Sequence, residues 1–201
     1  MLISFSEPLI AKTPDSWGLF VLDNLNLLLS DHAYCERKAA NFALSLLQRY
    51  GHLYPEHAPL SKLVREEMRH YELVLRILSS RSEVLARSAT SGYARHLRLS
   101  LSSSEPARHI QMLLIAALIE ARSCERFFVL SRVLSSVDEK LSVFYYKLAM
   151  AERRHHLLYT NLACALYDAD LVLTFLQDLS SIEHAWLAEN RLDYRMHSGI
   201  L

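Results

Sequence analysis

Hydrophobic side chains recur every three or four residues along most of the chain, which is the spacing of one face of an α-helix. The pattern predicts a helix start at Thr13-Pro14-Asp15-Ser16 and a long unbroken helix over about residues 22–50. Gly51 to Pro59 is typical of a helix stop followed by a turn, and a second helix is predicted over about residues 60–80. These two helices are expected to form an antiparallel hairpin.

A second hairpin is predicted in the other half of the chain. Its first helix begins at Ser104-Glu105-Pro106, with proline in the first turn, and ends at about Ser135. A short corner over residues 136–139 leads into a fourth helix, which ends at about Tyr167. A fifth helix is predicted over about residues 170–189, followed by a polar tail.

Two hairpins joined by a long connection predict an all-α fold, a ferritin-like four-helix bundle with one long crossover. The extra C-terminal helix is expected to pack outside this bundle, and residues 1–201 are expected to form a single domain. The composition agrees, because 4 Gly and 5 Pro are too few for the many turns of a β-sandwich or barrel.

Charge and cysteine content narrow the possible classes of protein. Lys and Arg total 22, as do Asp and Glu, so nucleic-acid binding would need a local basic patch. The widely spaced Cys35, Cys124 and Cys164 argue against a disulfide framework or a zinc site and fit a reducing cytosol. We expect a cytoplasmic protein without a membrane span, because charges interrupt every apolar stretch and the N-terminus lacks the features of a signal peptide.

A carboxylate interrupts each of the four predicted apolar stripes near its middle. Burying an ionised carboxylate costs several kcal/mol unless a cation offsets its charge, and four that converge would also repel one another. In two of the helices a histidine follows three residues after the carboxylate, on the same helix face. The six side chains are Glu36, Glu67, His70, Glu120, Glu152 and His155.

This pattern predicts a site for two divalent metal ions. One Glu from each of two helices, together with Glu-x-x-His from each of the other two, is the ligand set of dinuclear carboxylate proteins. The spacing repeats between the hairpins, because Glu67 follows Glu36 by 31 residues and Glu152 follows Glu120 by 32. The donors do not distinguish iron from manganese.

Three positions leave alternatives open. Glu125 lies on the same predicted helix as Glu120 and could replace it as a ligand, although Glu120 fits the stripe better. His156 could likewise replace His155, which matches the three-residue spacing of the first hairpin. His32, one turn before Glu36, could support that carboxylate or could be an ordinary core histidine.

The connection between the hairpins is basic. Between Ser80 and His109 it carries five Arg against two Glu, a net charge of +3 (five minus two). Arginine forks bind phosphate and stack on bases, so the patch is consistent with nucleic-acid binding. An ordinary solvated connection is the other interpretation.

Several stretches of the chain resemble the tRNA-(2-methylthio-N6-isopentenyladenosine) hydroxylase family. They are residues 31–40 (DHAYCERKAA), 64–70 (VREEMRH) and 119–127 (IEARSCERF), and residues 152–155 (ERRH) fit the family's last motif. The resemblance extends from about residue 22 to residue 167. The cysteine-containing strings are far more specific than Glu-x-x-His alone.

The resemblance implies a non-haem di-iron monooxygenase that hydroxylates the isopentenyl side chain of a modified adenosine beside the anticodon. It implies two iron ions, O2 and an external electron donor, with tRNA and an electron-transfer protein as partners. It places the iron ligands at the same six residues as the stripe analysis. Charge adds candidate tRNA contacts, which are Arg69, Arg95, Arg98, Arg153 and Arg154.

Two other classes of function remain open at this point. Another di-metal bundle, such as a ferroxidase, a manganese catalase or an oxygenase of small molecules, would use the same ligand set. A helical interaction protein without metal would instead pair its carboxylates with arginine.

Overall fold

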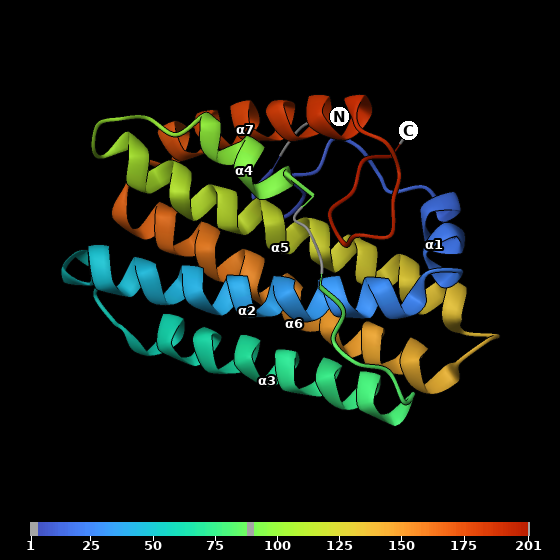
Figure 1. Cartoon of the computed structure of the whole chain (residues 1–201). Helices are drawn as coiled ribbons and strands as arrows, with labels where there is room; N and C mark the ends of the chain where they lie inside the picture. The colour runs from blue at the N-terminus through green and yellow to red at the C-terminus, as the bar shows by residue number, and fades with distance from the viewer. Residues whose placement is uncertain (1–3, 88–90, 201) are drawn as a thin grey trace. The chain divides into compact units, whose positions relative to one another are not determined.

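The computed structural model describes residues 4–87 and 91–200, and within these ranges the regular structure is helical (Figure 1). Residues 88–90 of the predicted connection and residues 1–3 of the N-terminal segment lie outside the described residues. The elements are α1 (Asp15–Leu22), α2 (Leu25–Tyr50), the 3-10 helix η1 (Gly51–Leu53), α3 (Ala58–Ser80), α4 (Tyr93–Leu99), α5 (Ala107–Leu134), α6 (Glu139–Leu166) and α7 (Ala169–Glu189).

The four predicted long helices and the predicted C-terminal helix are all present, with ends that differ by a few residues. Two features differ from the sequence-based expectation. The predicted helix start near Asp15 belongs to a separate helix, α1, because the helix is interrupted at Asp23 and Asn24, whose side chains favour turns. The connection also contains α4, which was not predicted, because seven residues are too few to establish a helical period.

The described chain divides into two compact units, and the prediction of a single domain over residues 1–201 stays a prediction. One, here the α2–α3 unit, contains α2, η1, α3 and residues Tyr194–Met196. Its two long helices run antiparallel, as Figure 1 shows. Leu29 and Leu46 of α2 and Leu63 and Val74 of α3 are buried, which is the amphipathic pattern that predicted the hairpin.

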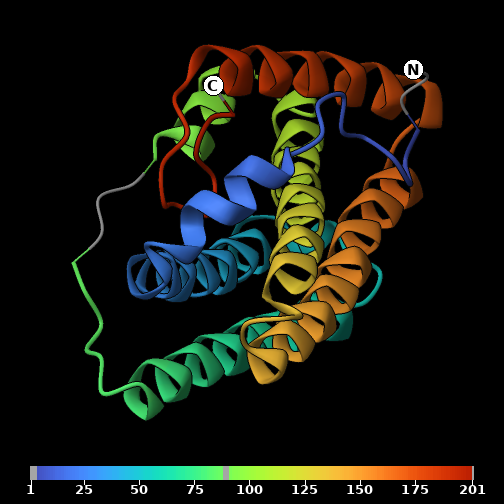
Figure 2. The same cartoon turned by 90° about the vertical axis from the view of Figure 1, so that its right-hand side faces the viewer.

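The other, here the α5–α6 unit, contains α1, α4, α5, α6 and α7. Asp138 starts α6 by accepting a hydrogen bond from the Leu141 amide at 3.0 Å, so the short corner returns the chain antiparallel to α5. Figures 1 and 2 show α7 as an additional helix of this unit, which crosses α5 at an angle. Gly18 allows α1 to approach α5 closely, because a Cβ at this position would lie 2.8 Å from Val129 Cγ1.

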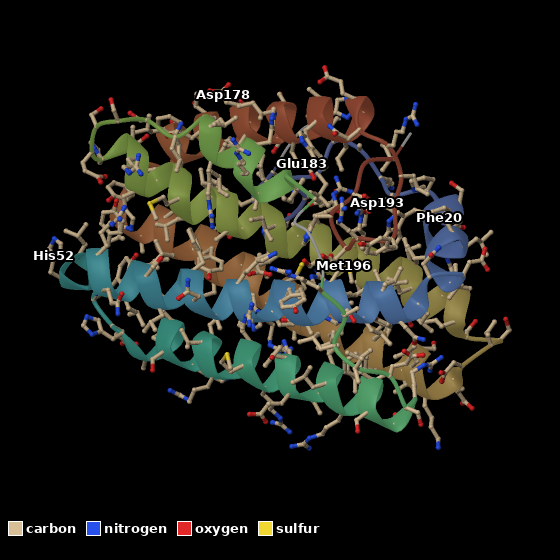
Figure 3. The ribbon with its side chains drawn as sticks, viewed as in Figure 1. Phe20, His52, Asp178, Glu183, Asp193 and Met196 are labelled. Atoms are coloured by element: carbon tan, nitrogen blue, oxygen red, sulfur yellow. The ribbon has the colours of Figure 1, made fainter. Side chains whose placement is uncertain are left out.

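A buried polar network joins α4, α5 and α7. Arg122 of α5 donates from Nε to Glu183 Oε1 at 2.8 Å and from Nη2 to Glu183 Oε2 at 3.0 Å, and Tyr93 donates to the same carboxylate at 2.9 Å. Figure 3 labels Glu183 on α7. Burial lowers the pKa of Arg122, but the Glu183 carboxylate outweighs this effect and the pKa stays above its ordinary value. The network therefore holds α7 on α5 with a fully desolvated ion pair.

None of the helices in the described ranges combines the length and the apolarity needed to cross a bilayer.

Candidate functional site

In the α2–α3 unit, two carboxylates and one imidazole form a buried triad. Glu36 comes from α2, and Glu67 and His70 come from α3. His70 Nδ1 lies 3.5 Å from Glu67 Oε2 and 3.6 Å from Glu36 Oε2, and each residue offers one ligand atom within 4.8 Å of the others. Glu67 and His70 share a face because they are three residues apart on one helix.

The Glu36 carboxylate is held by a histidine on its own helix. His32 Nε2 lies 2.5 Å from Glu36 Oε1, and the His32 side chain is fully buried. His32 is four residues before Glu36, so the two side chains stack along one helix face. Glu36 Oε1 is therefore oriented by His32, while Oε2 lies toward His70.

The α5–α6 unit holds a triad of the same composition. Glu120 comes from α5, and Glu152 and His155 come from α6. His155 Nδ1 lies 3.0 Å from Glu152 Oε2, and one ligand atom from each of the three residues lies within 4.8 Å of the others. All three side chains are buried. Each unit thus repeats the arrangement that the spacing of the sequence predicted.

Glu125, the alternative to Glu120, is engaged elsewhere. Its carboxylate accepts hydrogen bonds from the Thr13 amide at 2.7 Å, from Thr13 Oγ1 at 2.6 Å and from Arg122 Nη1 at 2.5 Å. It therefore fastens the N-terminal segment to α5, and Glu120 is the α5 carboxylate that lies with Glu152.

His156, the alternative to His155, is also engaged away from the triad. Its Nδ1 lies 2.9 Å from the Ala117 carbonyl oxygen, and its Nε2 lies 2.7 Å from the Phe5 carbonyl oxygen. Both ring nitrogens thus face backbone acceptors. His155 is the α6 histidine that contacts Glu152.

The donor chemistry of each triad fits a divalent metal ion. Carboxylate oxygens and imidazole nitrogens are ligands that iron and manganese accept. Two carboxylates placed side by side in a buried site repel each other, and a bound cation would offset that repulsion. The same negative field acts on the neighbouring thiol of Cys124, because burial and then the Glu152 carboxylate raise the pKa of this cysteine to about 12.

The five arginines predicted to contact tRNA are distributed over three helices and are exposed. Arg69 lies on α3, Arg95 and Arg98 lie on α4, and Arg153 and Arg154 lie on α6. Lys140 and Lys147 of α6 are exposed as well and were not among the predicted contacts. The sequence contains a signal for this row of cations, because the two lysines precede Arg154 by 14 and by 7 residues and therefore lie on the same side of the helix.

The whole chain is similar to one family of RNA-modifying enzymes. Residues 1–198 match the model of the family described as tRNA-(MS2IO6A)-hydroxylase (MiaE). The chain belongs to the MiaE family. This membership confirms the resemblance seen in the cysteine-containing strings.

Two relatives carry the name tRNA 2-(methylsulfanyl)-N(6)-isopentenyladenosine(37) hydroxylase. The protein from Pseudomonas putida is 36% identical over 94% of this chain and 90% of its own length. The protein from Salmonella typhimurium is 29% identical over 94% of this chain and 86% of its own length.

A solved structure of similar fold is described as Protein 43 with aldehyde deformylating oxygenase activity, from Synechococcus. It is 37% identical, its TM-score is 0.88, and the match covers 95% of this chain and 96% of that one. The predicted fold class, an all-α ferritin-like four-helix bundle with one long crossover and an extra C-terminal helix, is confirmed.

Proposed function

We propose that this protein is a tRNA hydroxylase that adds one oxygen atom to the isopentenyl side chain of 2-methylthio-N6-isopentenyladenosine next to the anticodon. Membership of the MiaE family and the names of the two relatives support the reaction and its substrate. The observation that carries the chemistry is the pair of buried triads, each with two carboxylates and one imidazole.

The six predicted ligand residues would hold two iron ions. The ligands would be Glu36, Glu67 and His70 from one unit and Glu120, Glu152 and His155 from the other. Four carboxylates balance the charge of two divalent ions. When bound, the iron pair supplies the reduction of O2 and the hydroxylation of the unreactive side chain.

The chain's own residues fix the ligands and exclude water. His32 orients the Glu36 carboxylate at 2.5 Å, which is the role of an outer partner behind a metal ligand. The six proposed ligand residues are all buried, so bulk water has little access to their side chains. No side chain need act as a general base, because hydroxylation at carbon involves no deprotonated nucleophile.

The overall reaction requires a reductant. One oxygen atom of O2 enters the substrate, and the other takes up two electrons and two protons and leaves as water. The electrons would come from an electron-transfer protein, and the tRNA would be held through contacts that include Arg69, Arg95, Arg98, Arg153 and Arg154. The protein would act in the cytoplasm, where its substrate is.

The test is direct. Reduced, iron-loaded protein is incubated with O2 and with tRNA that carries the isopentenyl group, and the digested nucleosides are analysed by mass spectrometry. We expect the modified adenosine to gain the mass of one oxygen atom. A nucleoside of unchanged mass, in a reaction in which the iron is reduced and is oxidised by O2, would contradict the proposal.

A second candidate function follows from the similar solved structure. Its description includes aldehyde deformylating oxygenase activity, so an oxygenase of small apolar substrates is the alternative. The same reduced protein is offered a long-chain aldehyde in place of tRNA. Loss of the aldehyde carbon as formate, without any oxygen gain on tRNA, would favour this alternative.

A further inference from the structure

The outer face of α6 carries a row of positive charge. Lys140, Lys147 and Arg154 are exposed and are spaced by seven residues, so they lie above one another at intervals of about 10.5 Å along the helix. Arg153 is exposed on the other border of the same face, and Glu139 is the one acidic residue of α6 exposed there. This face of α6 therefore carries four exposed cations and one exposed anion.

Between these cations lies a stripe of exposed apolar side chains. Val143 is 46% exposed, Tyr146 is 53% exposed and Met150 is 38% exposed, and half-buried Leu157 continues the stripe. Their spacing of three, four and seven residues places them on one side of the helix. Large apolar side chains gathered on one surface mark an interaction site more often than scattered ones do.

Tyr146 is the residue of this stripe best suited to stack on a base. Its ring packs edge-on against Phe128 of α5, with centroids 5.9 Å apart and an interplanar angle of 70°. This contact fixes the ring while half of the side chain stays open to solvent. Proteins bind unpaired bases of RNA on such aromatic rings, next to cations that neutralise the phosphates.

The face also lies on the helix that carries part of the candidate metal site. Arg153 and Arg154 are placed between Glu152 and His155 in the chain, and point outward where those two side chains are buried. Arg154 keeps one hydrogen bond to its own helix, from Nη1 to the Met150 carbonyl at 3.0 Å.

We propose that the outer face of α6 is the docking surface for the anticodon arm of the substrate tRNA. Lys140, Lys147 and Arg154 bind successive backbone phosphates, and Tyr146 stacks on an unpaired base of the loop. This inference rests on the proposed function for the identity of the RNA. A row of cations along about 21 Å matches an extended polyanion better than a single phosphate group.

The test measures binding without turnover. The affinity of the iron-loaded protein for tRNA carrying the isopentenyl group is determined at several salt concentrations. We expect the triple variant Lys140→Ala, Lys147→Ala, Arg154→Ala to bind about tenfold more weakly or worse, and the slope of log affinity against log salt to fall by about three. Wild-type affinity and slope in the triple variant would overturn the proposal.

The role of Tyr146 is tested by a loss of affinity that does not depend on salt. We expect Tyr146→Ala to weaken binding about tenfold with an unchanged salt slope, because stacking releases no counterions, and Tyr146→Phe to bind like the wild type. Arg76→Ala, which removes an exposed cation paired with Glu72 on α3, is the matched control and should bind normally. An iron content and a thermal midpoint equal to those of the wild type show that each variant is folded. If the triple variant does not fold, the binding test is repeated with the single variant Lys147→Gln.

Three further outcomes separate this proposal from its alternatives. The triple variant could bind tRNA normally, be reduced by dithionite at the wild-type rate, and be reduced by a protein donor more slowly than the wild type is. In that case the face binds an acidic redox protein and the proposal is wrong. A wild-type protein that binds tRNA through this face yet adds no oxygen would overturn the proposed function and leave the docking surface standing. One that adds oxygen while the triple variant binds normally would overturn only the docking surface.

Discussion

His32 Nε2 lies 2.5 Å from Glu36 Oε1, one turn away on α2. Both side chains are buried, so water does not compete for this contact. The other carboxylate oxygen, Oε2, lies toward His70 of α3. A carboxylate with one oxygen held by His32 and the other directed toward His70 is restricted in orientation before any ion binds. His32 is therefore a positioning residue for Glu36.

Removing the His32 donor should weaken metal binding. We expect His32→Leu to lower the affinity for ferrous iron by about 10- to 100-fold, because Glu36 loses its fixed orientation, while His32→Gln keeps a donor and recovers much of the loss. The measurement is competition with a chelator of known affinity. A leucine variant that holds iron like the wild type would show that His32 only fills space.

The two triads should be equally necessary. We expect Glu67→Ala and Glu152→Ala each to reduce bound iron to less than half of the wild-type content and to abolish hydroxylation, since each removes one carboxylate from one triad. Glu72→Ala, an exposed glutamate on the same helix as Glu67, is the control. Iron per chain is measured in the purified variants. Full iron content in both alanine variants would contradict the proposed ligands.

The buried Arg122–Glu183 pair should contribute strongly to folding. We expect Glu183→Leu to lower the free energy of unfolding by about 3–5 kcal/mol, because it leaves the Arg122 guanidinium buried with less compensation. The double variant Arg122→Met, Glu183→Leu should lose less than the two single changes added together. Arg132→Ala, which breaks the exposed pair with Asp15, should cost less than about 1 kcal/mol. Urea unfolding followed by circular dichroism gives all four values.

The cysteines should react slowly in the folded protein. Burial, with Asp31 adding to it, raises the pKa of Cys35 well above its ordinary value, and burial raises that of Cys124 to about 12. Thiolate is the reactive form, so its fraction at about pH 8 is small and alkylation should accelerate as the pH rises. We expect Cys164, whose pKa partial burial alone raises, to react first. Unfolding in urea exposes all three thiols and should make their alkylation rates similar. Similar rates at the three cysteines in the folded protein would refute this order.

The same shift predicts how stability depends on pH. Unfolded chains lose the Cys124 proton near the ordinary value of 9.0, whereas the folded protein keeps it up to about 12. The unfolded state therefore binds fewer protons between these values, and the contribution of Cys124 to stability falls as the pH rises through this window. Cys124→Ala should flatten that part of the stability profile. An unchanged profile would show that the thiol is not desolvated.

The exposed arginines of α4 offer a comparison with α6. Under the function proposed above, Arg95→Ala combined with Arg98→Ala should weaken tRNA binding and lower its salt slope by about two, with the iron content unchanged. The control Arg76→Ala should leave both quantities at the wild-type value. An unchanged salt slope in the double variant would remove α4 from the contact surface.

The sequence by itself determined the helices and the pairs within them. Glu67 with His70, and Glu152 with His155, are three residues apart, and on a helix that separation alone places two side chains on one face. The apolar stripes located the four long helices for the same reason, since amphipathic periodicity is a local property. The residue strings around Cys35 and Cys124 were sufficient to indicate the family.

Only the tertiary structure decided between neighbouring candidates. Glu125 turns away from the triad because Thr13, 112 positions earlier in the chain, donates to it, and His156 does so because the Phe5 carbonyl, 151 positions earlier, lies beside its ring. Such contacts leave no mark in local periodicity. They depend on which distant segments fold together, so the position of a polar side chain in a packed unit is fixed by partners that helical spacing alone does not specify.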